Sequence, residues 1–268
     1  FEEFWTRGDV HERVKIALKE ANLLEKKLEI EDLFPLDQYH ARGIAATIEL
    51  ADKLNFSKNS TIIDIGCGLG GPARYFSKRF NCNVYGIDIT EAFIEIGNYF
   101  NKLTHIDHQV TLLKGDGENL PYQTEFFDGA VSQHVTMNIE NREQFFNEAF
   151  RVLKKGAIFG FSEHGLGTKG SPIFPLPWAD NEDMSFLKTP EYTKSLLKKI
   201  GFKNIKIIST GEKYISGYNS LLKKGQSNEK PTLGIHVIGG DSMLERSKNS
   251  MRSIIENRTY PFEIICNR

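Results

Sequence analysis

Three glycines at alternate positions follow a run of branched apolar residues, and a nearby second run ends in a carboxylate. Residues 61–65 have the composition of a strand that is covered on both faces. Gly66, Gly68 and Gly70 then allow a sharp turn in which backbone N–H groups approach a ligand. Asp88 ends the second run, where a carboxylate can accept both hydroxyls of a ribose. The pattern therefore predicts a nucleoside-binding site.

The glycine spacing alone leaves two classes of cofactor open. Gly66, Gly68 and Gly71 also satisfy the G-x-G-x-x-G pattern of dinucleotide sites. However, Asp64 lies just before the turn and Asp116 follows a third expected strand, and carboxylates repel a pyrophosphate but suit a cationic ligand. An NAD(P)-dependent dehydrogenase is therefore the alternative enzyme class. It would leave the segment around Asp116 unexplained.

Five segments carry further motifs in a fixed order: 64–74, 86–88, 115–122, 127–135 and 151–156. Together they resemble the class I S-adenosylmethionine-dependent methyltransferases. The resemblance is to the small-molecule branch with the sarcosine/dimethylglycine N-methyltransferases and the ubiquinone/menaquinone C-methylases, and it covers most of the chain. It implies S-adenosyl-L-methionine as cofactor. It also implies a Rossmann-like α/β fold, with a seven-stranded, mostly parallel sheet, helices on both faces and an antiparallel last strand.

The resemblance also implies roles for individual residues. The glycine loop would lie along the methionine and ribose, Asp88 would bind the ribose hydroxyls, and Asp116 would accept from the adenine amino group. Gln133 would lie beside the methionine. The implied cofactor-binding residues are Tyr39, Arg42, Asp64, Gly66, Gly68, Gly70, Asp88, Asp116, Gly117 and Gln133. The structural alternatives are a plain strand-to-helix turn for the glycines and an Asp-Gly turn at Asp116.

An upstream segment, 37–43, resembles the N-terminal element that closes over the cofactor in this branch. There Tyr39 would face the sulfonium, and Arg42 or the N–H of Gly43 would meet the methionine carboxylate. An aromatic face attracts a cation by about 0.5–2 kcal/mol. Packing in the core is the alternative for Tyr39.

Methyl transfer needs alignment more than it needs reacting side chains. A tertiary or deprotonated amine needs no base, whereas a hydroxyl, a carbon acid or an ammonium does. The candidate bases are His134 and His164, each just past the end of a central strand, with Glu163 in a similar place. All three could instead be pocket-wall residues. We expect no metal.

Composition limits the partners. The 268 residues hold 34 basic and 35 acidic side chains, for a net charge of −1, so no global field favours nucleic acid or an anionic membrane. Three cysteines, with no C-x-x-C pair, favour a reducing compartment, and we expect a cytoplasmic location. No signal-peptide pattern or membrane-length apolar stretch is evident. A homo-oligomer stays open.

Helices and strands are expected to alternate, as a parallel sheet requires. The expected strands are 61–65, 84–88, 110–114, 127–132, 157–162, 205–209 and 261–266. The expected helices are 9–29, 41–54, 72–80, 91–103 and 142–153. The resemblance implies that the last two strands form the hairpin that contains the antiparallel strand.

We expect two parts: a helical cap over residues 1–55 that contributes to the site, and a methyltransferase domain over 56–268. Within the second part, the Pro- and aromatic-rich segment 165–190 suggests a substrate lid. Segment 211–248 could cap the same pocket or be a surface excursion.

The acceptor is less defined. A small amine such as sarcosine or dimethylglycine is favoured by the resemblance of segments 36–43 and 66–74. C- or O-methylation of a quinol or another small metabolite is the alternative. A non-catalytic module that binds S-adenosylmethionine is a further one.

Overall fold

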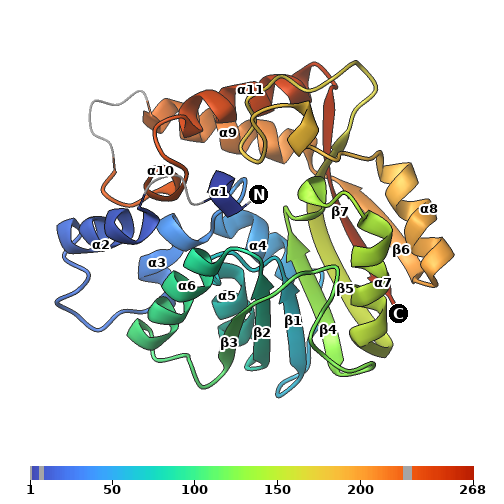
Figure 1. Ribbon diagram of the computed structural model, residues 1–268, viewed down its shortest axis with the longest axis horizontal. Helices are drawn as coiled ribbons and strands as arrows, with labels where there is room; N and C mark the ends of the chain where they lie inside the picture. The colour runs from blue at the N-terminus through green and yellow to red at the C-terminus, as the bar shows by residue number, and fades with distance from the viewer. Residues whose placement is uncertain (1, 6–8, 226–230) are drawn as a thin grey trace.

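The computed structural model describes residues 2–5, 9–225 and 231–268 (Figure 1). Its centre is a seven-stranded sheet of order β3-β2-β1-β4-β5-β7-β6. The strands are β1 Thr61–Ile65, β2 Asn83–Asp88, β3 Val110–Lys114, β4 Phe127–Gln133, β5 Leu153–Leu166, β6 Lys203–Ser209 and β7 Thr259–Asn267. Strands β1 to β5 pair in parallel, whereas β7 runs antiparallel to both β5 and β6. The expected Rossmann-like architecture with an antiparallel last strand is confirmed.

Helices cover both faces of this sheet. The helices are α1 Glu2–Trp5, α2 Val10–Glu20, α3 Ile30–Asp37, α4 Ile44–Ala51, α5 Gly71–Phe80, α6 Glu91–Leu103, α7 Arg142–Val152, α8 Pro190–Ile200, α9 Gly211–Gly225, α10 Ile235–Gly239 and α11 Met243–Ile255. Two short 3₁₀ turns are η1 Thr136–Asn138 and η2 Glu182–Met184. Among the described residues, no helix is both long and apolar enough to cross a membrane.

The side chains of β1 point alternately into the hydrophobic cores on the two faces of the sheet. Ile63 and Ile65 pack with Phe145 of α7 in one core, and Ile62 packs with Phe76 of α5 in the other. All five side chains are fully buried. Burial on both faces explains why this strand is a continuous branched apolar run.

The N-terminal helices differ from the expected ones. The helix expected over 9–29 ends at Glu20, where Asn22 takes a left-handed φ of 54° and the N–H of Leu23 donates back to the Leu18 carbonyl. This arrangement is a C-terminal cap, which stops the helix. The helix expected over 41–54 is shorter as well, since Gly43, with φ of 51°, forms its N-cap.

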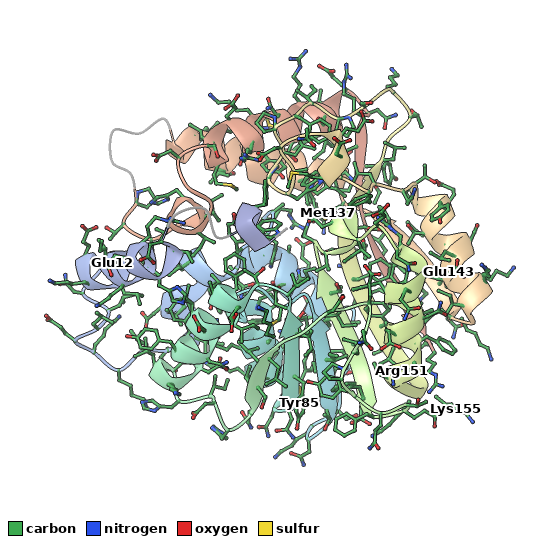
Figure 2. The ribbon with its side chains drawn as sticks, viewed as in Figure 1. Glu12, Tyr85, Met137, Glu143, Arg151 and Lys155 are labelled. Carbon is green, nitrogen blue, oxygen red and sulfur yellow. The ribbon has the colours of Figure 1, made fainter. Side chains whose placement is uncertain are left out.

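Both expected lid segments lie over the carboxyl ends of the strands (Figure 1). Residues 165–190 form a small core of their own, in which Leu176 and Trp178 pack on Met137. Figure 2 shows Met137 at the carboxyl end of the sheet and Tyr85 near the opposite end. The second segment contains α9, α10 and the first turns of α11. Residues 1 and 6–8 of the expected cap and 226–230 of this lid fall outside the described residues.

Candidate cofactor and acceptor site

A cavity of about 380 Å³ lies at the carboxyl ends of β1, β2 and β4. This volume is within the range of small-molecule sites. Of the residues proposed for the cofactor, those that line the cavity are Tyr39, Gly66, Gly68, Asp88, Asp116, Gly117 and Gln133. His134 also lines it, whereas Arg42, Asp64, Gly70 and His164 lie outside its wall. The structure therefore brings together side chains from five separate segments of the chain.

The glycine loop is held by the neighbouring strand. The N–H groups of Gly66 and Cys67 donate to the Ile87 carbonyl, and the N–H of Gly68 donates to the Asp88 carboxylate at 2.8 Å. A Cβ at Gly66 would lie 2.1 Å from a methyl of Val135, so packing excludes a side chain there. A Cβ at Gly68 would meet nothing within 4 Å. Because Gly68 lines the cavity, that open space is available to a ligand.

Substitution at Gly68 separates backbone strain from ligand exclusion. Gly68 has φ of 52° and Gly156, at the other end of the sheet, has φ of 79°, and an added Cβ is unobstructed at both. We expect Gly68→Ala and Gly156→Ala each to lower the free energy of unfolding by about 1 kcal/mol. Only Gly68→Ala should weaken S-adenosylhomocysteine binding, by about tenfold or more, in calorimetric titrations. Equal affinities for both variants would contradict a ligand at this loop.

The acids occupy different environments. Asp88 faces the cavity, and its other carboxylate oxygen accepts from the Thr90 N–H at 2.9 Å. Asp116 also faces the cavity and accepts from the Glu118 N–H at 2.8 Å. Asp64 is buried behind the loop, where desolvation and the charge of Asp88 raise its pKa to about 8. Asp64 is therefore protonated at neutral pH in the absence of a cation.

The raised pKa of Asp64 makes stability depend on pH. The unfolded chain releases this proton near pH 4 and the folded chain near pH 8, so burial of Asp64 costs more free energy as the pH rises between these values. We expect Asp64→Asn to remove part of that decline, so that the variant gains stability relative to the parent between pH 5 and pH 8. Urea unfolding at both pH values measures it, and a constant difference between the two proteins would contradict it.

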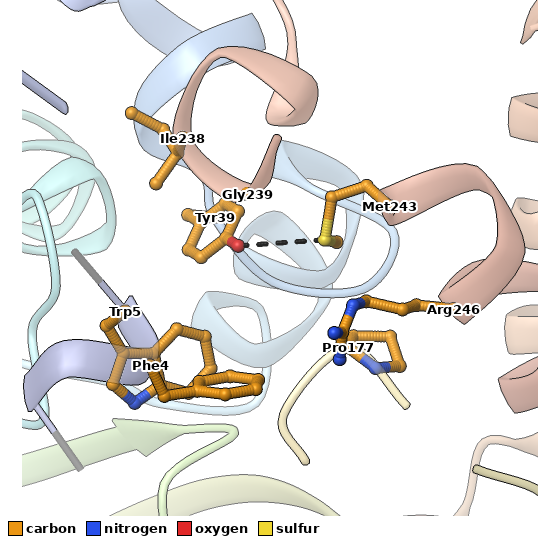
Figure 3. A pocket seen from close by; sticks show the side chains of 8 residues that line it. All are labelled: Phe4, Trp5, Tyr39, Pro177, Ile238, Gly239, Met243 and Arg246. Atoms are coloured by element: carbon orange, nitrogen blue, oxygen red, sulfur yellow. Dashed lines mark hydrogen bonds between the residues drawn. The ribbon is translucent and has the colours of Figure 1, made fainter. Parts of the chain in front are cut away.

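An aromatic wall faces the glycine loop. Tyr39 lies edge-to-face on Trp5 and Phe93, with ring centroids 6.0 and 6.2 Å away. Its hydroxyl lies 3.8 Å from the sulfur of Met243 on α11, in a small second pocket of about 10 Å³ that shares Trp5 and Tyr39 with the cavity (Figure 3). Tyr39 thus serves the core packing and the cavity wall together.

Two polar residues of the proposed cofactor set have an unpartnered donor among the described residues, but only Gln133 lines the cavity. The Gln133 side chain accepts from Thr47 Oγ1 at 3.2 Å, and its Nε2 is buried without a hydrogen-bond partner in the described part of the chain. Arg42 lies outside the cavity wall, where its Nη2 pairs with Glu49, its guanidinium lies over the Tyr214 ring and its Nη1 is buried without a hydrogen-bond partner among the described residues. Gln133 therefore has a donor free for a ligand at the cavity wall.

The candidate bases lie on two faces of the sheet. His134 faces the cavity, and His164 lies behind it, 4.6 Å from the Trp178 ring, with both ring nitrogens unpartnered within the described ranges. Burial lowers the pKa of both histidines, that of His164 to about 3, so both are neutral. On the other face Arg142 pairs with Glu163 at 2.9 Å. Burial raises the pKa of Glu163 to about 7 although Arg142 opposes it.

A buried ion pair supports the loop from below. Arg74 of α5 pairs with Asp37 of α3 at 2.9 Å and also donates to the Leu69 carbonyl in the glycine loop at 2.6 Å. Its other terminal nitrogen donates to Asn101 of α6 at 2.7 Å. Arg74 and Asp37 are at most 2% exposed. This pair joins three helices to the loop.

Other cavity residues escaped the sequence analysis: Trp5, Ile89, Thr90, Phe93, Asn138, Ile139, Glu140 and Phe186. Ile89 is 48% exposed directly after Asp88, and this position beside the strand-end acid is a signal that could have found it. The remainder come together only through the fold. Within the described residues, no group of three or more His, Cys, Asp and Glu side chains is arranged to hold a metal ion.

Comparisons with known proteins agree with this geometry. Residues 63–161 match the family described as "Methyltransferase domain". The chain is 26% identical over 221 residues to the sarcosine/dimethylglycine N-methyltransferase of Halorhodospira halochloris, which covers 82% of this chain and 77% of that protein. It is 33% identical over 114 residues to the sterol 24-C-methyltransferase of Candida albicans, which covers 42% of this chain and only 30% of that longer protein.

A solved structure shares the fold. Haemonchus contortus phosphoethanolamine N-methyltransferase 2, solved with S-adenosyl-L-methionine, superposes with a TM-score of 0.71 at 16% identity, over 85% of this chain and 53% of that one. The motifs, the sheet order and the methyltransferase domain matched over residues 63–161 together support a class I S-adenosylmethionine-dependent methyltransferase.

Proposed function

We propose that this chain transfers the methyl group of S-adenosylmethionine to a small-molecule acceptor. The observation that carries the proposal is the cavity in which the glycine loop, Asp88 and Asp116 meet. Carboxylates at this wall favour a ligand with a positive charge and disfavour a pyrophosphate. The open space at Gly68 and the free amide donor of Gln133 fit such a ligand.

The proposed cofactor-binding residues keep the roles that the sequence suggested. Gly66, Gly68 and Gly70 shape the loop beside the methionine and ribose, Asp88 accepts from the ribose hydroxyls, and Asp116 and Gly117 receive the adenine. Tyr39 presents its ring to the sulfonium. Gln133 donates to the methionine end. Asp64, which is protonated in the absence of a cation, loses its proton and adds negative charge behind the loop when the sulfonium is bound. Arg42 pairs with Glu49 through Nη2, and its Nη1, which has no partner among the described residues, is the donor proposed for the methionine carboxylate.

The chemistry requires little from the protein. S-adenosylmethionine supplies a methyl group on a positively charged sulfur. The cavity walls hold the acceptor nucleophile in line with the methyl group, which lowers the barrier by orientation. His134 is the candidate base that faces the cavity, and His164 is a candidate behind it. Because the pKa of both is lowered, the chain suits an acceptor that has no proton to lose.

We propose a small amine such as sarcosine or dimethylglycine as the acceptor. The similarity to the Halorhodospira enzyme, over most of both chains, supports this choice. C-methylation of an apolar metabolite is the second candidate, because the match to the sterol enzyme is higher in identity and aromatic side chains line the cavity.

We also propose the helical cap over 1–55, lids at 165–190 and 211–248, and a cytoplasmic location without nucleic-acid partners. The described cysteines, Cys67, Cys82 and Cys266, are all free and buried, which suits a reducing compartment.

Two titrations and one assay test the function. S-adenosylhomocysteine should bind in a calorimeter whereas NADH should not. Transfer of a labelled methyl group to dimethylglycine, sarcosine or a quinol then distinguishes an enzyme from a non-catalytic module and identifies the acceptor. Tight NADH binding without S-adenosylhomocysteine binding would overturn the proposal.

A further inference from the structure

Tyr214 of α9 reaches from the lid to the strand-end histidine. Its hydroxyl lies 2.6 Å from Nε2 of His134, although the two residues are 80 positions apart in the sequence. Tyr214 is 1% exposed. The ring of Tyr214 also lies edge-to-face on His164, with centroids 5.1 Å apart. Tyr214 of the proposed lid therefore contacts both candidate bases.

The backbone conformation of His134 orients its side chain toward Tyr214. His134 has φ of 59°, in the left-handed region, and its N–H donates to the Ser162 carbonyl at 2.8 Å. A non-glycine residue in that region costs free energy and is held there by its surroundings, often at functional sites. The turn directs the side chain of His134 into the cavity wall.

The pair is surrounded by two further histidines, whose pKa values burial lowers, and by two charged side chains that each have a partner of opposite charge. The His40 ring stacks on His134 with centroids 5.8 Å apart, and the His164 centroid lies 5.4 Å away. Arg42 lies over the Tyr214 ring at 5.7 Å and pairs with Glu49. Glu263, which pairs with Lys53, acts on Tyr214 only through its charge. Within the described ranges, the Tyr214 hydroxyl is the hydrogen-bond partner of the His134 ring.

This arrangement selects one tautomer. Burial raises the pKa of Tyr214, and a hydrogen bond from the Ser162 hydroxyl to the Tyr214 oxygen opposes that rise. Because that oxygen accepts from Ser162, and because a buried hydroxyl proton without an acceptor costs about 1–3 kcal/mol, the Tyr214 O–H donates to Nε2 of His134. The proton of the neutral imidazole then lies on Nδ1, for which no partner is present among the described residues. Nδ1–H can therefore donate to a molecule in the cavity.

We infer that Tyr214 is a positioning residue: it holds His134 in one orientation and tautomer, so that the ring donates a hydrogen bond to the methyl acceptor. The inference rests on the proposed function and adds to it a role for the lid. Tyr214 itself contacts no reacting atom.

The test compares two tyrosines of one helix. Tyr214→Phe keeps the ring and removes the hydroxyl. Tyr218→Phe is the matched control, since Tyr218 is also buried on α9 and its hydroxyl bonds instead to Ser250 at 2.9 Å. In ¹⁵N-histidine-labelled protein, with the His134 signals assigned from His134→Gln, we expect the Nδ1-protonated form in the parent and in Tyr218→Phe. Tyr214→Phe should give a mixture of tautomers.

Kinetics with dimethylglycine as probe provide the second readout. Tyr214→Phe should lower kcat about tenfold, leave the KM for S-adenosylmethionine within twofold, and have no further effect in the His134→Gln background. Unchanged ¹⁵N shifts in Tyr214→Phe, or an equal loss of kcat with and without His134, would overturn the inference. A parent protein that shows the expected shifts but methylates no acceptor would instead refute the proposed function alone.

Discussion

Replacement of Asp88 by alanine should weaken S-adenosylhomocysteine binding at least 100-fold. The substitution removes the proposed acceptor for both ribose hydroxyls. It also leaves the N–H groups of Gly68 and Thr90 without the carboxylate that now orders the loop. Two hydrogen bonds to a charged group contribute about 3 kcal/mol or more, which corresponds to the expected loss. Calorimetric titration measures it.

Two further variants serve as controls for this measurement, one conservative at the same position and one at a distant acid. Asp88→Asn should lose about tenfold, because the amide oxygen still accepts one hydrogen bond. Asp107→Asn changes an exposed acid just before β3, at the opposite end of the sheet, and should bind like the parent. Asp88→Ala with parental affinity would show that the nucleoside lies elsewhere.

The parts of the fold that the sequence predicted are those with local signals. Strand β1, over 61–65, and helix α6, over 91–103, have the expected bounds, because strand burial and helical spacing act over a few residues. The 9–29 prediction was wrong because it continued the helical spacing past Asn22, a residue type that takes the left-handed conformation at helix ends and does so after α2. Strand β5 extends beyond 157–162, since β7 pairs with it as far as Leu166 and β4 pairs with it at Leu153.

The site was predictable only in part for the same reason. Gly68, Asp88 and Asp116 belong to short motifs next to strand ends, and parallel strands bring such ends together. The contact between His134 and Tyr214 joins β4 to α9, and nothing local to either residue indicates it. Arg42, just before α4, pairs with Glu49 within α4, and this contact depends on the backbone turn at Gly43.

Arg74→Met should be the most destabilising single change considered for this chain. It leaves the Asp37 carboxylate buried without its partner, and breaking a buried pair on one side costs about 3–5 kcal/mol. Burial already raises the pKa of Asp37, and the loss of Arg74 removes the charge that opposes this rise. The deficit should therefore shrink as the pH falls from 7 toward 4, because Asp37 of the folded variant takes up its proton at a higher pH than Asp37 of the folded parent. Urea unfolding at pH 7 and pH 4 measures both effects.

Arg79→Met is the matched control on the same helix. Arg79 pairs with Asp52 at 2.6 Å, but both side chains are substantially exposed, so its loss should cost less than about 1 kcal/mol. The double change Asp37→Leu with Arg74→Met should recover much of the deficit, since no buried charge is left unpaired. A deficit for Arg74→Met as small as that for Arg79→Met would mean that water reaches Asp37.

The connection between β6 and β7 leaves the sheet at Thr210 and returns to it at the start of β7. Its two ends lie side by side, because the N–H of Thr210 donates to the Pro261 carbonyl at 3.1 Å. The described elements between these two points are α9, which carries Tyr214, α10 and α11, and they lie outside the hairpin formed by β6 and β7. Such an insert can diverge, or be exchanged as a cassette with that of another member of the family, without disturbing the parallel strands. If the proposed lid selects the acceptor, the substrate range can change there while the proposed nucleoside-binding loop stays the same.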